Sequence, residues 1–138
     1  MKVLKAALSA FLILGLAGYL LAAEAVHKHA PTPEMRRQHN SMSVTMKQWA
    51  ALKKSLAKGD FAAAEFALAR MQKAASALEK FKLHKNAKKI EEFREQSRIY
   101  RENLTELGKA LKEQVKAQAQ GHAVMIDKSC SQCHDVFR

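Results

Sequence analysis

The sequence predicts an all-α protein in which four helices pack as an antiparallel up-down-up-down bundle. Five Gly and two Pro residues in 138 are too few for the turn-rich β folds. Helix-favouring Ala, Leu, Lys, Glu, Gln and Met dominate after residue 33, and apolar residues recur there at helical spacing. A chain of this length is expected to form one domain, and its two cysteines rule out a disulfide-rich scaffold.

Residues 1–23 are predicted to be a secretory signal peptide rather than part of the fold. Lys2 and Lys5 precede an uncharged apolar run from Ala6, and small residues end it near Ala23. The run is close to the shortest length that spans a membrane, so an uncleaved membrane anchor is the alternative. In either case we expect the rest of the chain to lie outside the cytoplasm, in the periplasm.

Two helices are predicted in the first half of the remaining chain. Residues 24–33 form a linker because Pro31 and Pro33 interrupt regular structure. A first helix is expected over 34–57 and a second over 61–82, with Gly59 and Asp60 between them and Asn86 capping the helix that follows. The apolar stripe of the first helix is Met35, His39, Met42, Met46, Trp49, Leu52 and Leu56. The inward residues of the second are Phe61, Ala64, Leu68, Met71, Ala75, Leu78 and Phe81.

The third helix has the clearest pattern, and its end is set by a change of phase. Apolar positions recur at alternating spacings of three and four, which is typical of helices packed almost parallel in a bundle. They are Ile90, Phe93, Ser97, Tyr100, Leu104, Leu107 and Leu111. From Val115 on, the apolar residues are out of phase with this seam, so we expect a turn near 108–112 or a stutter in one long helix. The turn gives helices of matched length, and the bundle domain then covers 34–138.

The motif that carries chemistry lies near the end of the last helix. Cys130, Ser131, Gln132, Cys133 and His134 form CxxCH, the attachment motif of c-type haem. Two cysteines three residues apart lie on one face of a helix and can each form a thioether, while the histidine that follows can bind the iron as proximal ligand. A disulfide would close too small a loop to stabilise much, and a zinc site lacks a second pair of ligands. We therefore predict one covalently attached haem c, on the last helix.

A four-helix bundle with one CxxCH at its end resembles the cytochrome c′ family. Residues 130–138 are similar to that family's terminus, with Phe137 three and Arg138 four residues beyond His134, and the pair Arg37 and Gln38 resembles the family's first helix. The resemblance implies haem packed near one end of the bundle, with the sixth iron position facing the first helix. It also implies that Arg37 pairs with the haem propionates and that Arg138 lies near the proximal face.

The sixth ligand separates the two functions that this resemblance implies. Family members are low-spin when a methionine fills the position and high-spin when an apolar residue does. Here the register departs by one residue, since Ser41 lies three and Met42 four positions beyond Gln38. Serine is a poor ligand, so Met42 is the predicted one. His39, Met46 and an open site remain alternatives, and Met42 as an ordinary core residue is the fourth.

The predicted function is that of a monohaem c-type cytochrome in periplasmic electron transfer, with iron bound by His134 and Met42. The alternative is a five-coordinate cytochrome c′-like protein that binds NO or CO. No general acid–base pair is visible in the sequence, so no enzyme is predicted. The net charge of +11 becomes +9 when Lys2 and Lys5 are removed with residues 1–23, and this positive balance favours an acidic redox protein as partner. Nucleic acid is not expected, a membrane is expected only if residues 1–23 stay attached, and a homodimer is left open.

Overall fold

The structure is a computed structural model that describes residues 30–83 and 85–138. The chain divides into two units, 1–32 and 33–138. The second unit contains four α-helices, which are α2 (Pro33–Lys58), α3 (Phe61–Ala75), α4 (Ile90–Lys112) and α5 (Lys116–Phe137). No strand occurs among the described residues, which confirms the all-helical class and the four helices.

The predicted signal segment 1–23 and residues 24–29 of the predicted linker lie outside the described residues. Within the part of the chain that is described, no helix is long and apolar enough to cross a membrane.

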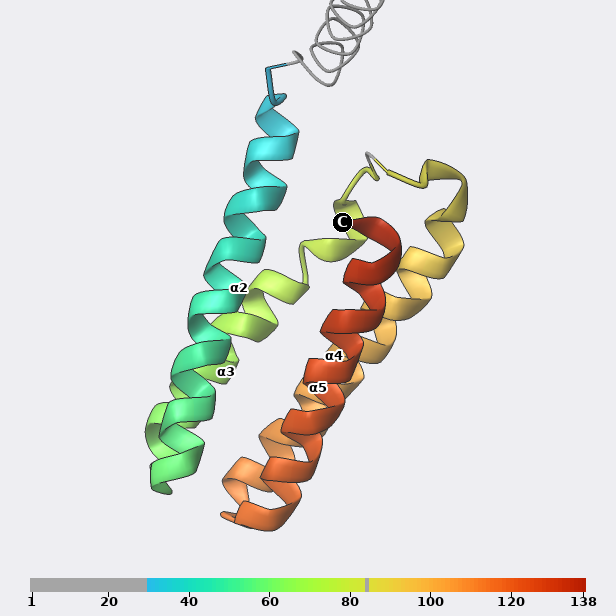
Figure 1. Ribbon diagram of the computed structural model, residues 1–138. Helices are drawn as coiled ribbons and strands as arrows, with labels where there is room; N and C mark the ends of the chain where they lie inside the picture. Colours follow the sequence, from blue (N-terminus) through green and yellow to red (C-terminus); the bar gives the residue numbers. More distant parts are fainter. Residues whose placement is uncertain (1–29, 84) are drawn as a thin grey trace, which may run out of the picture. The chain divides into compact units, whose positions relative to one another are not determined.

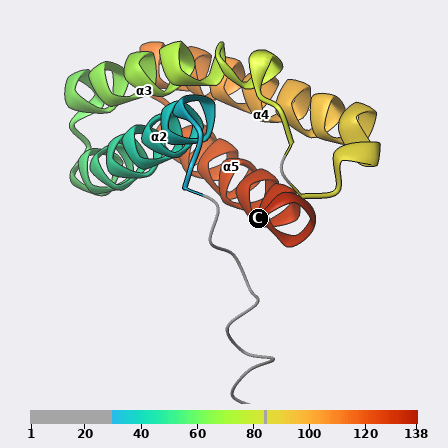
Figure 2. The ribbon, with the colours of Figure 1, turned by 90° about the horizontal axis from the view of Figure 1, so that it is seen from above.

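The helices pack in pairs around one core. Figure 1 shows α2 beside α3 and α4 beside α5, and Figure 2 shows the same pairs from above. Contacts between α3 and α4 join the pairs, and α2 meets α5 over a shorter stretch. The fully buried large side chains of the core are Leu52, Met71, Leu104, Leu107, Leu111 and Ile126. The predicted seam of the third helix therefore lies inside, as its spacing requires.

Residue chemistry explains the turn from α2 to α3. Gly59 has φ of 75°, in the left-handed region that a residue with a Cβ rarely adopts. Asp60 then caps α3, because its Oδ1 accepts a 3.0 Å hydrogen bond from the backbone N–H of Ala63. Both residues act where the sequence predicted them to act.

The helix α3 is shorter than the predicted span 61–82, which is a correction. It ends at Ala75, and the short 3-10 helix Leu78–Lys80 and extended backbone at Phe81 follow. Ser76 contributes to this end because its hydroxyl donates to the carbonyl of Lys73, at 2.8 Å, and so competes with the helical pattern. Leu78 still packs into the core.

The break before α5 falls at 113–115, just beyond the expected 108–112. Helix α4 continues because Leu111 is fully buried and Gly108 lets α4 approach α3, where a Cβ would lie 3.2 Å from Leu68 Cδ2. Gln114, at φ of 56°, makes the reversal, and the N–H of Val115 donates to the carbonyl of Ala110. The interpretation as a turn, rather than a stutter, is confirmed.

Candidate haem-attachment site

The residues of the CxxCH motif lie together on α5. Cys130 and Cys133 are one helical turn apart, His134 is one turn beyond Cys130, and all three side chains are half-buried. Both cysteines are free thiols. The motif therefore offers two unpaired thiols and an imidazole on one side of a helix, close to the end of α5.

Burial keeps both thiols protonated. It raises the pKa of Cys130, and the nearby Asp127 carboxylate raises it further, whereas Lys53 acts in the opposite direction. Burial also raises the pKa of Cys133, from 9.0 to about 11, and the Cys130 sulfur adds to this shift. Two thiols on one face of a helix match the two vinyl groups of a porphyrin, since each thioether forms by adding S–H across a vinyl double bond.

The residues present fit a c-type haem. The donor set has the two thiols and the adjacent imidazole that the motif requires, and Cys130 packs against the hydrophobic core rather than lying free in solvent. On α4, burial raises the pKa of the Tyr100 hydroxyl, and the Cys130 sulfur raises it further. Within the described part of the chain, the buried Tyr100 Oη and Gln96 Oε1 have no hydrogen-bond partner.

A hydrogen bond ties this stretch of α5 to α2. The indole Nε1 of Trp49 donates to Asp127 Oδ1 at 2.7 Å, and Lys53 Nζ lies 3.2 Å from the same oxygen. The Lys53 ammonium also lies 4.9 Å from the centre of the Trp49 ring, in a cation–π contact. Asp127 is seven residues before His134, so the two project from nearly the same side of α5.

The candidate sixth ligands on α2 differ in burial. Met42 is half-buried and packs against the core cluster. Met46 was expected in the inward stripe, which is wrong, because its side chain is 63% exposed. His39 is exposed too, although the predicted stripe includes it. Near the start of α2, the buried side chain is instead that of Gln38. Its amide donates to the carbonyl of Lys82 at 3.2 Å.

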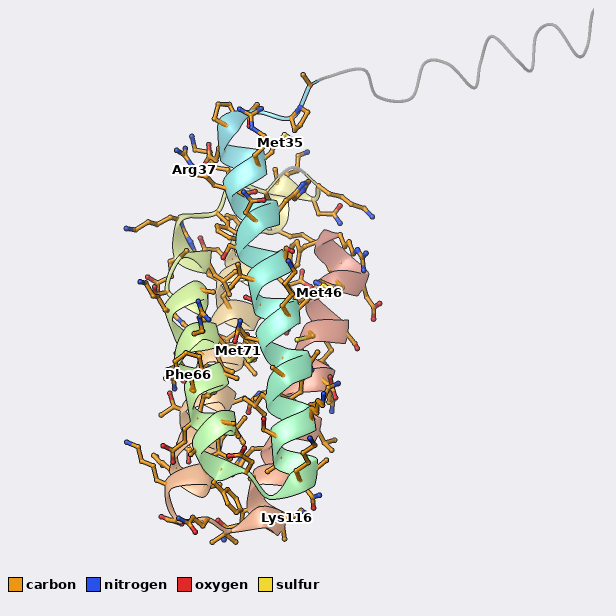
Figure 3. The ribbon with its side chains drawn as sticks, turned by 90° about the vertical axis from the view of Figure 1, so that its left-hand side faces the viewer. Met35, Arg37, Met46, Phe66, Met71 and Lys116 are labelled. Atoms are coloured by element: carbon orange, nitrogen blue, oxygen red, sulfur yellow. The ribbon has the colours of Figure 1, made fainter. Side chains whose placement is uncertain are left out.

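The two arginines are exposed and lie in different places. Arg37 and Met46 project from opposite sides of α2 (Figure 3), as their separation of nine residues requires. Arg37 therefore does not lie on the side of α2 that carries Met42. Arg138 follows α5 directly, where its backbone N–H donates to the carbonyl of His134, at 3.2 Å.

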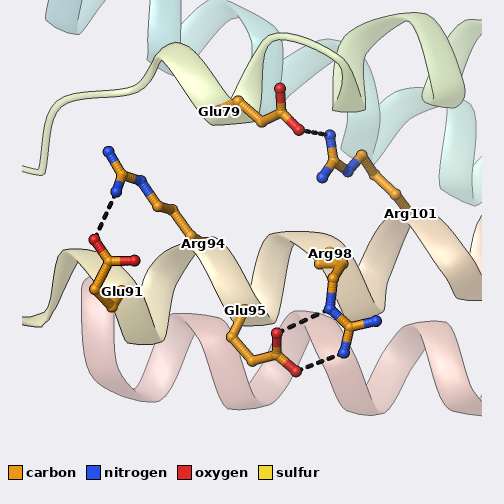
Figure 4. A pocket seen from close by; sticks show the side chains of 6 residues that line it. All are labelled: Glu79, Glu91, Arg94, Glu95, Arg98 and Arg101. Carbon is orange, nitrogen blue, oxygen red and sulfur yellow. Dashed lines mark hydrogen bonds and ion pairs between the residues drawn. The ribbon is translucent and has the colours of Figure 1, made fainter.

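A charged cluster lies on the outer face of α4 and includes Glu79 of the 3-10 helix Leu78–Lys80. Glu79, Glu91, Arg94, Glu95, Arg98 and Arg101 line a surface hollow (Figure 4). Its charges pair with one another, as Arg94 with Glu91 at 2.6 Å and Arg101 with Glu79. No group of three His, Cys, Asp or Glu side chains suited to a metal ion is found among the described residues. The hollow is thus a neutralised ion-pair network.

Sequence reasoning missed the link through Asp127 and interpreted Trp49 only as a core aromatic. No local pattern points to this link, because the hydrogen bond joins residues 78 positions apart in the sequence. Comparison with protein-family models finds no match to this chain, and comparison with curated proteins finds none either.

Proposed function

We propose that this protein is a monohaem c-type cytochrome of periplasmic electron transfer, in which His134 and Met42 bind the iron. The observation that carries the proposal is the pair of unpaired, half-buried thiols of Cys130 and Cys133, one turn apart on α5 and followed directly by His134. No other arrangement of these residue types in the described chain offers two attachment points and an axial ligand on one helix face.

The bundle is proposed to have antiparallel up-down-up-down order, with the haem attached on α5. Contacts between α2 and α5 support it. Lys116, at the start of α5, donates to the carbonyl of Ala57 near the end of α2, and Asp127, further along α5, meets the earlier Trp49. Contacts between α4 and α5 follow the same rule, since Asn103 bonds to Ser129 and the earlier Phe93 packs edge-on against Phe137.

This order supports Met42 as the sixth ligand. Moving one heptad from Asp127 toward the end of α5 leads to His134. The matching step along an antiparallel α2 leads from Trp49 to Met42, and from Lys53 to Met46. Both methionines then lie level with His134. Met42 is the one that packs against the core, whereas Met46 extends into solvent.

The chain's own residues would hold the group and control its surroundings. A haem bound between His134 and a thioether sulfur supplies one-electron oxidation and reduction without a change of ligands. Cys130 and Cys133 anchor it covalently to α5. Trp49 and Asp127 fix the spacing of α2 and α5, so the Met42 sulfur is held at a constant position. A fixed ligand set favours electron transfer because little has to rearrange.

Localisation and partner follow from the same proposal. Covalent attachment of haem to CxxCH proteins occurs outside the bacterial cytoplasmic membrane, which agrees with the interpretation of residues 1–23 as an export signal. The positive surface favours an acidic redox protein as electron donor or acceptor. No catalytic group is assigned.

The test is the mass and absorption spectrum of protein exported to the periplasm together with the haem-attachment machinery. The mass is expected to exceed that of the polypeptide by one haem, and to fall to the polypeptide mass in Cys130→Ser/Cys133→Ser. Oxidised protein should be low-spin, with a sulfur-to-iron charge-transfer band, and reduced protein should respond little to CO. A high-spin spectrum with rapid CO binding would instead favour the five-coordinate gas-binding function.

A further inference from the structure

The connection between α3 and α4 carries four exposed lysines, Lys82, Lys85, Lys88 and Lys89, called here the basic cluster. Side-chain contacts attach it to the last turn of α5. Asn86 Nδ2 donates to the carbonyl of Val136 at 2.5 Å, and Lys85 Nζ donates to a main-chain oxygen of Arg138 at 2.7 Å. Asn86 stands at the N-cap position of the short 3-10 helix Ala87–Lys89 that leads into α4, as predicted, but its side chain makes no cap hydrogen bond and forms this tether instead.

The tether puts the basic cluster at the end of the bundle that carries His134. His134 is only four residues before Arg138, which directly follows α5, so the rise between them is about 6 Å. On α2, Gln38 bonds to the carbonyl of Lys82, so the same connection also lies against the start of that helix. Figures 1 and 2 both show the end of α5 beside this connection.

Part of the positive charge of the cluster is not compensated. Lys82 pairs with Glu34 at 3.5 Å and Lys89 with Glu92 at 3.0 Å. Among the described residues, no Asp or Glu carboxylate lies within ion-pair distance of Lys85 or Lys88. Lys85 donates to a main-chain oxygen of Arg138, the last residue of the sequence, so Lys88 is the lysine of the cluster whose charge is least compensated. The outer face of α4 differs, because there Arg94, Arg98 and Arg101 are each paired with a glutamate.

We propose that the basic cluster is the docking site for an acidic electron-transfer protein. This inference rests on the proposed function, since it places the partner beside the helix end that holds His134. Uncompensated lysines steer a negatively charged partner and accelerate its association. A membrane is the less suitable occupant, because none of the exposed large hydrophobic side chains of the described chain comes from this connection.

Lys112 provides a matched control at the other end of α5. It is an exposed lysine in the last turn of α4, next to the turn that leads into α5. The 22 residues of α5 separate that turn from the basic cluster by about 33 Å, three Debye lengths or more at physiological ionic strength. Lys88→Gln and Lys112→Gln therefore remove the same charge at opposite ends, and both leave the Asn86 and Lys85 tethers in place.

The experiment measures reduction of the oxidised haem protein by a reduced, acidic plant-type [2Fe–2S] ferredoxin in stopped flow, at an ionic strength of about 0.1 M, where the Debye length is about 10 Å. Lys88→Gln is expected to lower the second-order rate about threefold, and Lys112→Gln to leave it within about 1.5-fold of the unchanged chain. Added salt should remove the difference. Circular dichroism and the midpoint potential should be the same in all three proteins.

Three outcomes would overturn the inference. Equal rates for the two variants would show that the cluster does not steer the partner. Unchanged ferredoxin rates together with Lys88-dependent sedimentation on phosphatidylserine vesicles would assign the cluster to a membrane surface. A polypeptide mass without haem would contradict the proposed function itself, and it is recognised before any rate is measured.

Discussion

The indole of Trp49 and the carboxylate of Asp127 are joined by a 2.7 Å hydrogen bond that connects α2 to α5. The indole is almost buried, whereas half of the Asp127 side chain is exposed, so the bond seals the edge of the core between the two helices. It lies one heptad from the proposed ligands His134 and Met42. The spacing of those ligands therefore depends on a contact outside the motif.

Asp127→Ala is expected to lower the free energy of unfolding of the haem-free chain by about 2 kcal/mol, because it leaves the buried Trp49 N–H without a partner. Asp127→Asn should cost less, since an amide oxygen still accepts the bond. Lys53→Gln should cost less than about 1 kcal/mol, because the Lys53–Asp127 pair is exposed. Urea unfolding measures all three. Equal losses for Asp127→Ala and Lys53→Gln would show that the indole hydrogen bond contributes little.

The α2–α3 turn offers a test in which only the backbone is strained. Gly59 has φ of 75°, and a Cβ added there would meet nothing within 4 Å. Gly59→Ala should therefore destabilise the fold by about 1 kcal/mol through conformational strain alone. Gly59→Asn should destabilise it less, because asparagine tolerates the left-handed region. Thermal unfolding separates the two variants, and identical midpoints would contradict this account.

Tyr100→Phe is expected not to destabilise the fold, unlike the substitutions at Asp127 and Gly59. Its hydroxyl is buried without a partner in the described structure, and burial raises its pKa. Tyr100→Phe removes this unpaired group and keeps the ring. It should leave the stability of the haem-free chain unchanged or raise it by up to about 1 kcal/mol. A loss of stability in urea unfolding would mean that the hydroxyl has a bonding partner in solution.

The seam of α4 shows how far the sequence could predict this fold. Its spacing gave the buried residues Phe93 to Leu111, because strict alternation of three and four has one explanation in a helix. Met46 and Asn86 could not be placed in the same way. The periodicity of α2 does not tell which flank of its stripe faces a neighbour, and Asn86 is used by Val136, fifty residues away. Such contacts depend on tertiary packing, which local pattern does not contain.

The two thiols of the candidate site should make the haem-free chain sensitive to alkaline pH. Burial raises the pKa of Cys133 from 9.0 to about 11, and that of Cys130 in the same direction. Between pH 9 and 11 the folded chain therefore keeps protons that the unfolded chain has lost. The stability is fully present below pH 9 and falls as pH rises toward 11.

Urea unfolding at several pH values measures this fall. Cys130→Ser/Cys133→Ser, which has no thiols at these positions, should show a smaller dependence on pH over the same range. Alkylation by iodoacetamide should likewise be slow at pH 8 and accelerate as pH rises toward 11. Fast alkylation of the folded chain at pH 8 would contradict the burial of the thiols.

The final prediction separates the two methionines that lie level with His134 in the proposed order. Met42→Leu keeps an apolar side chain of similar volume and removes the sulfur, so the haem protein should become high-spin, bind CO and lose its sulfur-to-iron band. Its midpoint potential should fall, because a thioether ligand favours the reduced iron. Met46→Leu, at the 63% exposed position, should keep the spectrum of the unchanged chain. A low-spin spectrum in Met42→Leu that disappears in Met42→Leu/Met46→Leu would assign the ligand to Met46, and one that persists in both would direct the search to His39.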